Sequence, residues 1–169
     1  MELPFRKDAD ELTRFHVGRG GAVLGEHDAR AAGGHSQDQV DHWQLDEAVP
    51  GRMIVPGMIM YWFGSDLFYA NVALFAEQIR KLVNDSPTPV HWLAIDCGAI
   101  TNMDFSAGRA LVDLHQDLAK AGVVLALSRL QLIPHGNLER MGLVDLIGAN
   151  RIFDSRHACI EAYRSEAKS

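Results

Sequence analysis

The 169-residue chain has no long hydrophobic run and no cluster of basic residues. Its longest apolar stretch, from Met58 to Phe63, is far shorter than the ~20 residues that a membrane-spanning helix needs. Lys and Arg are scattered and the formal net charge is -6, which disfavours a nucleic-acid partner because neutralising phosphates requires clustered basic side chains. We therefore expect neither nucleic-acid binding nor direct membrane insertion by this chain.

Cysteine is also scarce. The only two cysteines, Cys97 and Cys159, do not form a CxxC pair, so the usual zinc and thioredoxin patterns are absent. Both lie in apolar stretches, which predicts two small buried residues in a reducing compartment. The segment from Met1 to Phe15 alternates acidic and basic residues and does not resemble a signal peptide. The chain is expected to be soluble and cytoplasmic, with any membrane part on another segment or another chain.

What remains is an ordinary globular composition, with 47% hydrophobic and 22% charged residues. The pattern changes near residue 50. The stretch from Gly18 to Gln44 is rich in glycine and has no sustained apolar period, so residues 1–49 are predicted to be a linker or poorly ordered arm. Its three histidines are too widely spaced for one helical face, and no metal site is expected. Residues 50–167 are predicted to form one domain.

In that domain short apolar runs alternate with helical patterns, which predicts an α/β fold with mostly parallel strands. We expect a mixed sheet of four to six strands with about four helices. The expected strands are Met53–Val55, Met58–Phe63, Trp92–Asp96, Val123–Leu127 and Arg151–Phe153. The expected helices run from an Asn71 cap to Asn84, from Ser106 to Ala121, from Leu138 to Met141, and onward from Ser155.

The most informative segment runs from the Trp92 strand into the second long helix. It places Thr101, Asp104 and Ser106 at a helix N-terminus on the carboxyl edge of a parallel strand, where unpaired N–H groups and the helix dipole favour an anion or phosphoryl group. Arg129 follows the next strand and is a candidate for the same site. The alternatives are that Asp104 and Ser106 only cap the helix, that Phe105 packs against its first turn, and that Arg129 is ordinary surface charge.

From about Pro50 to Ala167 the chain resembles the STAS family, the domains shared by sulfate permeases and anti-sigma factor antagonists. The resemblance rests on element order and on three pieces similar to the SulP-type permease branch. These pieces are Met60 to Asn71, Ile100 to Asp104, and Met141-Gly142-Leu143 followed by Arg151-Ile152-Phe153 and a closing helix.

The resemblance implies a STAS fold and a non-enzymatic regulatory domain at the cytoplasmic face of a sulfate or anion transporter. Its partner would be the membrane domain of the permease or another STAS copy in a homo-oligomer. Phe68, Asn71 and Phe105 are the candidates for this contact. No cofactor is expected, although an anion or nucleotide could bias the contact.

One position departs from the family pattern. In anti-sigma factor antagonists the residue after the loop aspartate accepts a phosphate, but here that residue is Phe105, which has no hydroxyl, and Ser106 comes next. A free-standing antagonist remains the alternative function. A receiver-like phospho-acceptor at Asp96 is disfavoured, because only one acid, Asp66, follows the Met58 strand. No Ser-His-Asp order is recognisable.

Overall fold

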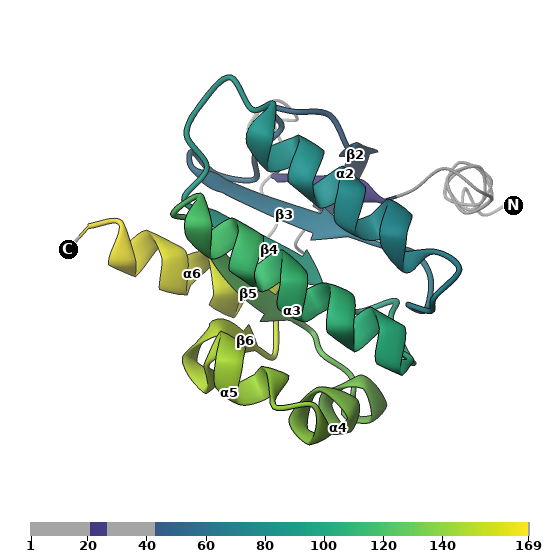
Figure 1. The fold of residues 1–169 in the computed structure, drawn as a ribbon. Helices are drawn as coiled ribbons and strands as arrows, with labels where there is room; N and C mark the ends of the chain where they lie inside the picture. The colour runs from purple at the N-terminus through teal and green to yellow at the C-terminus, as the bar shows by residue number, and fades with distance from the viewer. Residues whose placement is uncertain (1–20, 27–42, 169) are drawn as a thin grey trace, which may run out of the picture.

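The computed structural model describes residues 21–26 and 43–168 (Figure 1). Their strands form one six-stranded sheet in the order β2-β1-β3-β4-β5-β6. The strands are β1 (Ala22–Glu26), β2 (Trp43–Glu47), β3 (Met58–Trp62), β4 (Trp92–Asp96), β5 (Val124–Ser128) and β6 (Ile152–Phe153). The helices are α2 (Val72–Asn84), α3 (Phe105–Lys120), α4 (Leu132–Arg140), α5 (Leu143–Ile147) and α6 (Arg156–Glu166), with a 3-10 turn at Ala149–Arg151.

The centre of the sheet is parallel. β3, β4, β5 and β6 pair in parallel, whereas β1 runs antiparallel to both β2 and β3. All five residues of β3 and all five of β4 are buried. Strands covered on both faces need apolar side chains at every position, which explains why these strands read as continuous apolar runs rather than alternating ones.

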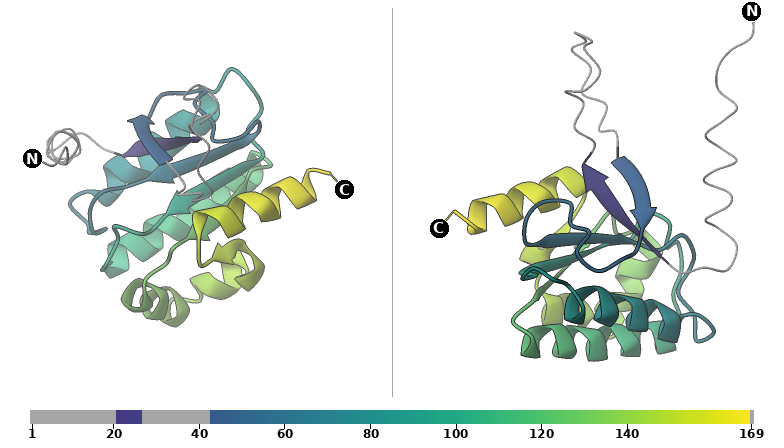
Figure 2. Two further views of the ribbon diagram at one scale, coloured as in Figure 1. Left: turned by 180° about the vertical axis from the view of Figure 1, so that it is seen from behind. Right: turned by 90° about the horizontal axis from the view of Figure 1, so that it is seen from above.

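The helices cover the sheet unequally (Figures 1 and 2). α2 and α3 lie side by side on one face, and α6 crosses the other face. Two separate apolar cores result. The larger lies under α2 and α3 and also takes in Leu138 of α4 and Leu143 and Ile147 of α5. The smaller lies under α6 and contains Trp92, Cys159 and Tyr163.

The two long helices form where the apolar spacing predicts them. α2 buries Val72, Phe75, Ala76, Ile79 and Leu82, which fall on one stripe of a 3.6-residue period. α3 buries an equivalent stripe and begins at Phe105, one residue before the expected start. The six-stranded, mostly parallel α/β architecture agrees with the expected fold class.

The expectation of a linker over residues 1–49 is wrong for two segments, because β1 and β2 are strands of the sheet. Ala22, Val23 and Leu24 are almost fully buried, with β1 paired between β2 and β3. These pairings join residues far apart in sequence, so no local period reveals them. Outside these two strands the structure describes only residues 21, 48 and 49 of this segment, and the three histidines at 27, 35 and 42 lie outside the described residues.

Two further elements differ from the prediction. Met53–Val55 is not a strand: Val55 makes a single bridge to Met58 around the Pro56-Gly57 turn. The short helix expected at Leu138–Met141 is part of α4, which starts six residues earlier, and α5 follows it. Pro134 lies in the first turn of α4, where a missing N–H removes no helical hydrogen bond, so this proline does not exclude a helix.

Candidate functional site

The loops after β3 and β4 meet at the carboxyl edge of the sheet and are joined by Asp66. Its Oδ1 accepts hydrogen bonds from Thr101 N at 2.7 Å, Thr101 Oγ1 at 2.9 Å and Asn102 N at 2.9 Å. The backbone adds a bridge between Leu67 and Met103. The predicted site residue Thr101 is exposed, and its hydroxyl already donates to the carboxylate of Asp66.

Asp104 caps α3 and also fixes the loop before α2. Its Oδ1 accepts from Ala107 N at 2.9 Å, and its Oδ2 accepts from Tyr69 N at 2.9 Å. The hydrogen bond from Ala107 N, with that from Tyr69 N, lowers the pKa of this carboxyl below its ordinary value. The capping interpretation of Asp104 is confirmed. Ser106 is exposed in the first turn of the helix, and a ligand role for either residue stays a prediction.

Asn71 precedes α2 as expected but does not cap it through its side chain. Its Oδ1 accepts from Phe68 N at 3.0 Å, and its Nδ2 donates to Asp66 O at 2.8 Å. Asn71 thus shapes the loop that presents Phe68. The same loop carries Tyr69, which sequence reasoning did not single out.

Further exposed apolar side chains stand on the elements next to this loop. Phe105 is 76% exposed, so the expectation that it packs against the first turn of α3 is wrong. Helix α4 lies beside the N-terminal end of α3 and is tied to it by Asn137 Nδ2, which donates to Met103 O at 2.9 Å (Figure 1). We call the exposed apolar side chains at this edge the edge patch. It consists of Phe68, Tyr69, Phe105, Leu132 and Ile133.

Sequence reasoning found two members of the edge patch, Phe68 and Phe105, and missed the other three. Leu132 is 92% exposed, although it begins a helix. The available signal was the pair Leu132-Ile133, two large apolar residues that belong to no strand and to no buried helical stripe. Such residues at an exposed position point to a contact surface when several lie together.

Arg129 does not join this edge as a free cation. Its Nε and Nη2 donate to the two carboxylate oxygens of Asp96 at 2.7 and 2.8 Å, and Arg156 Nε donates to Asp96 Oδ2 at 2.6 Å. The alternative of ordinary surface charge is wrong, because Arg129, at the end of β5, is paired with a buried carboxylate, and a ligand role for Arg129 stays a prediction. Asp96 itself is fully buried, so it is not an accessible phospho-acceptor of the receiver kind.

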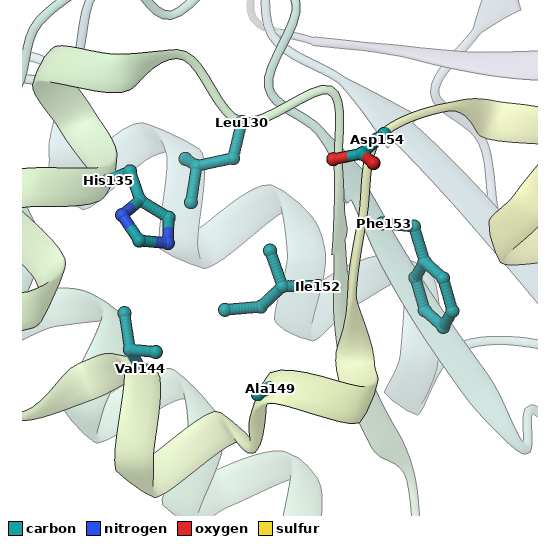
Figure 3. Close-up of a pocket in the computed structure, with 7 residues that line it drawn as sticks. All are labelled: Leu130, His135, Val144, Ala149, Ile152, Phe153 and Asp154. Carbon is teal, nitrogen blue, oxygen red and sulfur yellow. The ribbon is translucent and has the colours of Figure 1, made fainter.

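A cavity of about 230 Å³ opens between β6 and the helices α4 and α5 (Figure 3). Leu130, Val144 and Ile152 give it apolar walls, while the side chains of His135 and Asp154 lie on opposite sides of the space. The sequence did not predict it. Among the residues that the structure describes, no helix is long and apolar enough to cross a bilayer, and no three His, Cys, Asp or Glu side chains are grouped to hold a metal ion.

Residues 53–159 match the family model of the STAS domain, and this range is more than half of the chain. The chain belongs to the STAS domain family. The α/β fold with its six-stranded, mostly parallel sheet is thus that of a STAS domain.

The relatives of this STAS domain include sulfate transporters. A probable sulfate transporter of Mycobacterium tuberculosis is 28% identical over 115 residues, which are 68% of this chain and 20% of the relative. The domain therefore spans about a fifth of that protein. Together with the family match, this relates the chain to the STAS domains of SulP-type sulfate transporters.

Solved structures show the same fold. The murine Slc26a9 anion transporter in its inward-facing state has a TM-score of 0.68 at 16% identity and covers 93% of this chain and 24% of that one. A putative anti-sigma factor antagonist from Thermotoga maritima has a TM-score of 0.58 at 15% identity and covers 69% of this chain and 94% of that one. At these identities the likeness extends to the fold alone.

Proposed function

We propose that this STAS domain is a non-enzymatic regulatory domain of a SulP-type sulfate or anion permease, located at the cytoplasmic face of the membrane. It acts by contact with the membrane domain of the permease or with another STAS copy. The edge patch is the observation that carries the proposal. Its five large apolar side chains stand on three neighbouring elements at one edge, whereas exposed apolar residues that need no explanation occur singly.

The chemistry of the edge patch suits a protein partner. Phe68, Tyr69 and Phe105 are aromatic, and aromatic anchors dominate the binding energy of many protein interfaces. Tyr69 is 78% exposed and Phe105 76%, so both have most of their surface to bury against a partner. Burial of apolar surface is the main favourable term in association.

The loops under the edge patch are held in place before any partner arrives. Asp66 binds three donors of the Thr101 loop, and Asp104 ties the Tyr69 loop to α3. A surface that is already ordered loses less conformational freedom on binding. Thus the hydrogen bonds of the two aspartates favour recognition even though neither carboxylate needs to touch the partner.

The regulatory effect would be a shift in the populations of transporter conformations, because a domain that contacts one conformation better than another favours that conformation. No bond is made or broken. An anion or nucleotide at the helix N-terminus near Asp104 and Ser106 could compete with the existing caps and thereby change the contact.

The test is a permease that contains this domain. We expect Phe105→Ser combined with Tyr69→Ser to weaken the contact with the membrane domain at least about tenfold, because exposed aromatic anchors commonly contribute ~2 kcal/mol or more. Leu146→Ser, which changes an exposed leucine of α5 outside the edge patch, is the matched control and should bind like wild type. Binding is measured by titration, with circular dichroism to confirm folding.

Two results would contradict the proposal. One is equal binding by the double variant and the Leu146 control. The other is normal transport and trafficking by a permease from which Trp62 to Gly142 has been deleted. Recovery of a kinase-like anti-sigma factor with this chain, together with phosphate mapped to Ser106, would instead favour the free-standing antagonist.

A further inference from the structure

The side of the sheet covered by α6 holds a charged cluster that the proposed function does not use. The carboxylate of Asp96, fully buried at the end of β4, binds the guanidinium groups of both Arg129 and Arg156. One carboxylate neutralises one guanidinium, so the three groups together carry one excess positive charge. The side chains of Arg129 and Arg156 remain 36% and 19% exposed, which leaves this charge reachable from solvent.

The backbone conformation around the cluster positions its side chains. Arg129 has a φ of +55°, and it is the one non-glycine residue with positive φ in the described part of the chain. A side-chain carbon added at Gly98 would lie 2.2 Å from Cζ of Arg129, so a larger residue there would displace that guanidinium from its present position. Unfavourable backbone conformations persist where the surrounding structure holds them, and they gather at functional sites.

A buried hydroxyl beside the cluster has no partner. Ser128 is fully buried, and its Oγ makes no hydrogen bond within the described residues. The parallel register pairs Ser128 with Asp96 on one side and with Phe153 on the other. Ser128 therefore lies on the strand between Asp96 and the segment that leads into Arg156. An unpaired buried hydroxyl is costly, so Ser128 Oγ would gain a hydrogen bond from an acceptor that reaches the end of β5.

Helix α6 adds to the positive potential. It begins at Arg156, and the capping hydroxyl of Ser155 accepts only from Ala158 N, so other first-turn N–H groups of this 11-residue helix are available. The carboxylate of Asp154, two residues before α6, lies on the side of the cavity between β6 and the helices α4 and α5 (Figure 3). His157 is exposed in the same turn.

We propose that Arg129, Arg156, Ser128 and the N-terminus of α6 form a binding site for a small tetrahedral oxyanion such as sulfate or phosphate. Guanidinium groups match the oxygen spacing of such anions and bind them with two parallel hydrogen bonds. The site goes beyond the proposed function, since it lies on the α6 side of the sheet and includes no residue of the edge patch. Occupancy would strengthen the attachment of α6 to the ends of β4 and β5.

The experiment uses the isolated chain, so it succeeds or fails independently of any permease. Sodium sulfate or sodium phosphate is titrated at constant ionic strength against sodium chloride, and amide NMR shifts are followed. We expect saturable shifts at Ser128, Arg156 and His157. Arg156→Gln should weaken binding at least about tenfold, because it removes a charge-assisted donor. Asp96 keeps its bidentate partner Arg129 in this variant, so the fold should hold.

A second variant separates binding from stability. Ser128→Ala removes an unpaired buried hydroxyl and should leave stability unchanged or raised, yet weaken the oxyanion. Arg109→Gln, an exposed change on α3, is the matched charge control and should bind like wild type. Sulfate stabilises all proteins to some degree by exclusion from their surfaces, and that effect is common to every variant. Unsaturable shifts, equal affinity in Arg156→Gln, or shifts confined to Asp104 and Ser106 would each overturn the proposal.

Discussion

Asp104 shows how one carboxylate serves two segments. One oxygen caps α3, and the other holds Tyr69 in the preceding loop, 35 residues earlier in the chain. The cap could be predicted, because an aspartate directly before an apolar helical pattern is a local signal. The bond to Tyr69 N could not, and neither could the three bonds that Asp66 accepts across a similar interval. Residue roles that depend on distant partners are not encoded in local sequence.

The lowered pKa of Asp104 makes a prediction about pH. Its charged form is stabilised in the folded state, so its contribution is present above the pKa of an unfolded aspartate and is lost as the pH falls through the lower folded value. Asp104→Asn replaces one accepting oxygen by an amide donor. We expect a lower melting temperature than wild type at neutral pH, with the difference shrinking on acidification. A difference that stays constant down to strongly acidic pH would contradict this role.

At the level of elements, the sequence predicts those helices that bury one full apolar stripe and those strands that are buried along their whole length. α2 and α3 carry five-residue buried stripes, β3 is apolar throughout, and β4 is apolar except for Asp96 at its end. β1 and β2 escaped prediction because their partners lie far away in the chain. The predicted helix over Leu138–Met141 covers only the end of α4, since α4 buries only Pro134 and Leu138 and exposes Leu132 and Ile133. A helix with so small a buried face gives little periodic signal.

The start of helix α6 is stabilised by its N-cap residue, Ser155. Ser155 Oγ accepts from Ala158 N at 3.1 Å, and the same turn presents Arg156 to Asp96. Ser155→Ala should lower the free energy of unfolding by about 1 kcal/mol, the usual effect of losing such a cap. Ser106→Ala, an exposed change in the first turn of α3, should alter it by less than about 0.5 kcal/mol. Urea denaturation measures both, and a larger loss of stability from Ser106→Ala than from Ser155→Ala would show that the capping role of Ser155 has been assigned wrongly.

At the scale of the whole molecule, the two cysteines report on both faces of the sheet. Cys97 lies in the core under α2 and α3, and Cys159 in the core under α6. Burial raises the pKa of Cys159 to about 12 and also raises that of Cys97. Because only the thiolate reacts, neither thiol should react with a disulfide reagent in the native state.

The thiols should therefore become reactive only on unfolding, and at one common rate if the sheet opens as a unit. Mass spectrometry of partly labelled samples checks this, since cooperative opening gives unlabelled and doubly labelled chains with few singly labelled ones. An abundant singly labelled species would show that the two cores open separately.

Phe105 at the start of α3 also limits how fast the contact at this edge can be regulated. A hydroxyl at position 105 could be phosphorylated by a kinase and dephosphorylated by a phosphatase, which would change the charge at this edge without synthesis of new protein. The side chain of Phe105 has no second chemical state of that kind, so the surface it occupies is the same from the day the chain is synthesised until it is degraded. Control of the contact through residue 105 itself is therefore limited to the amounts of the partners, and a faster signal would have to act on a neighbouring residue.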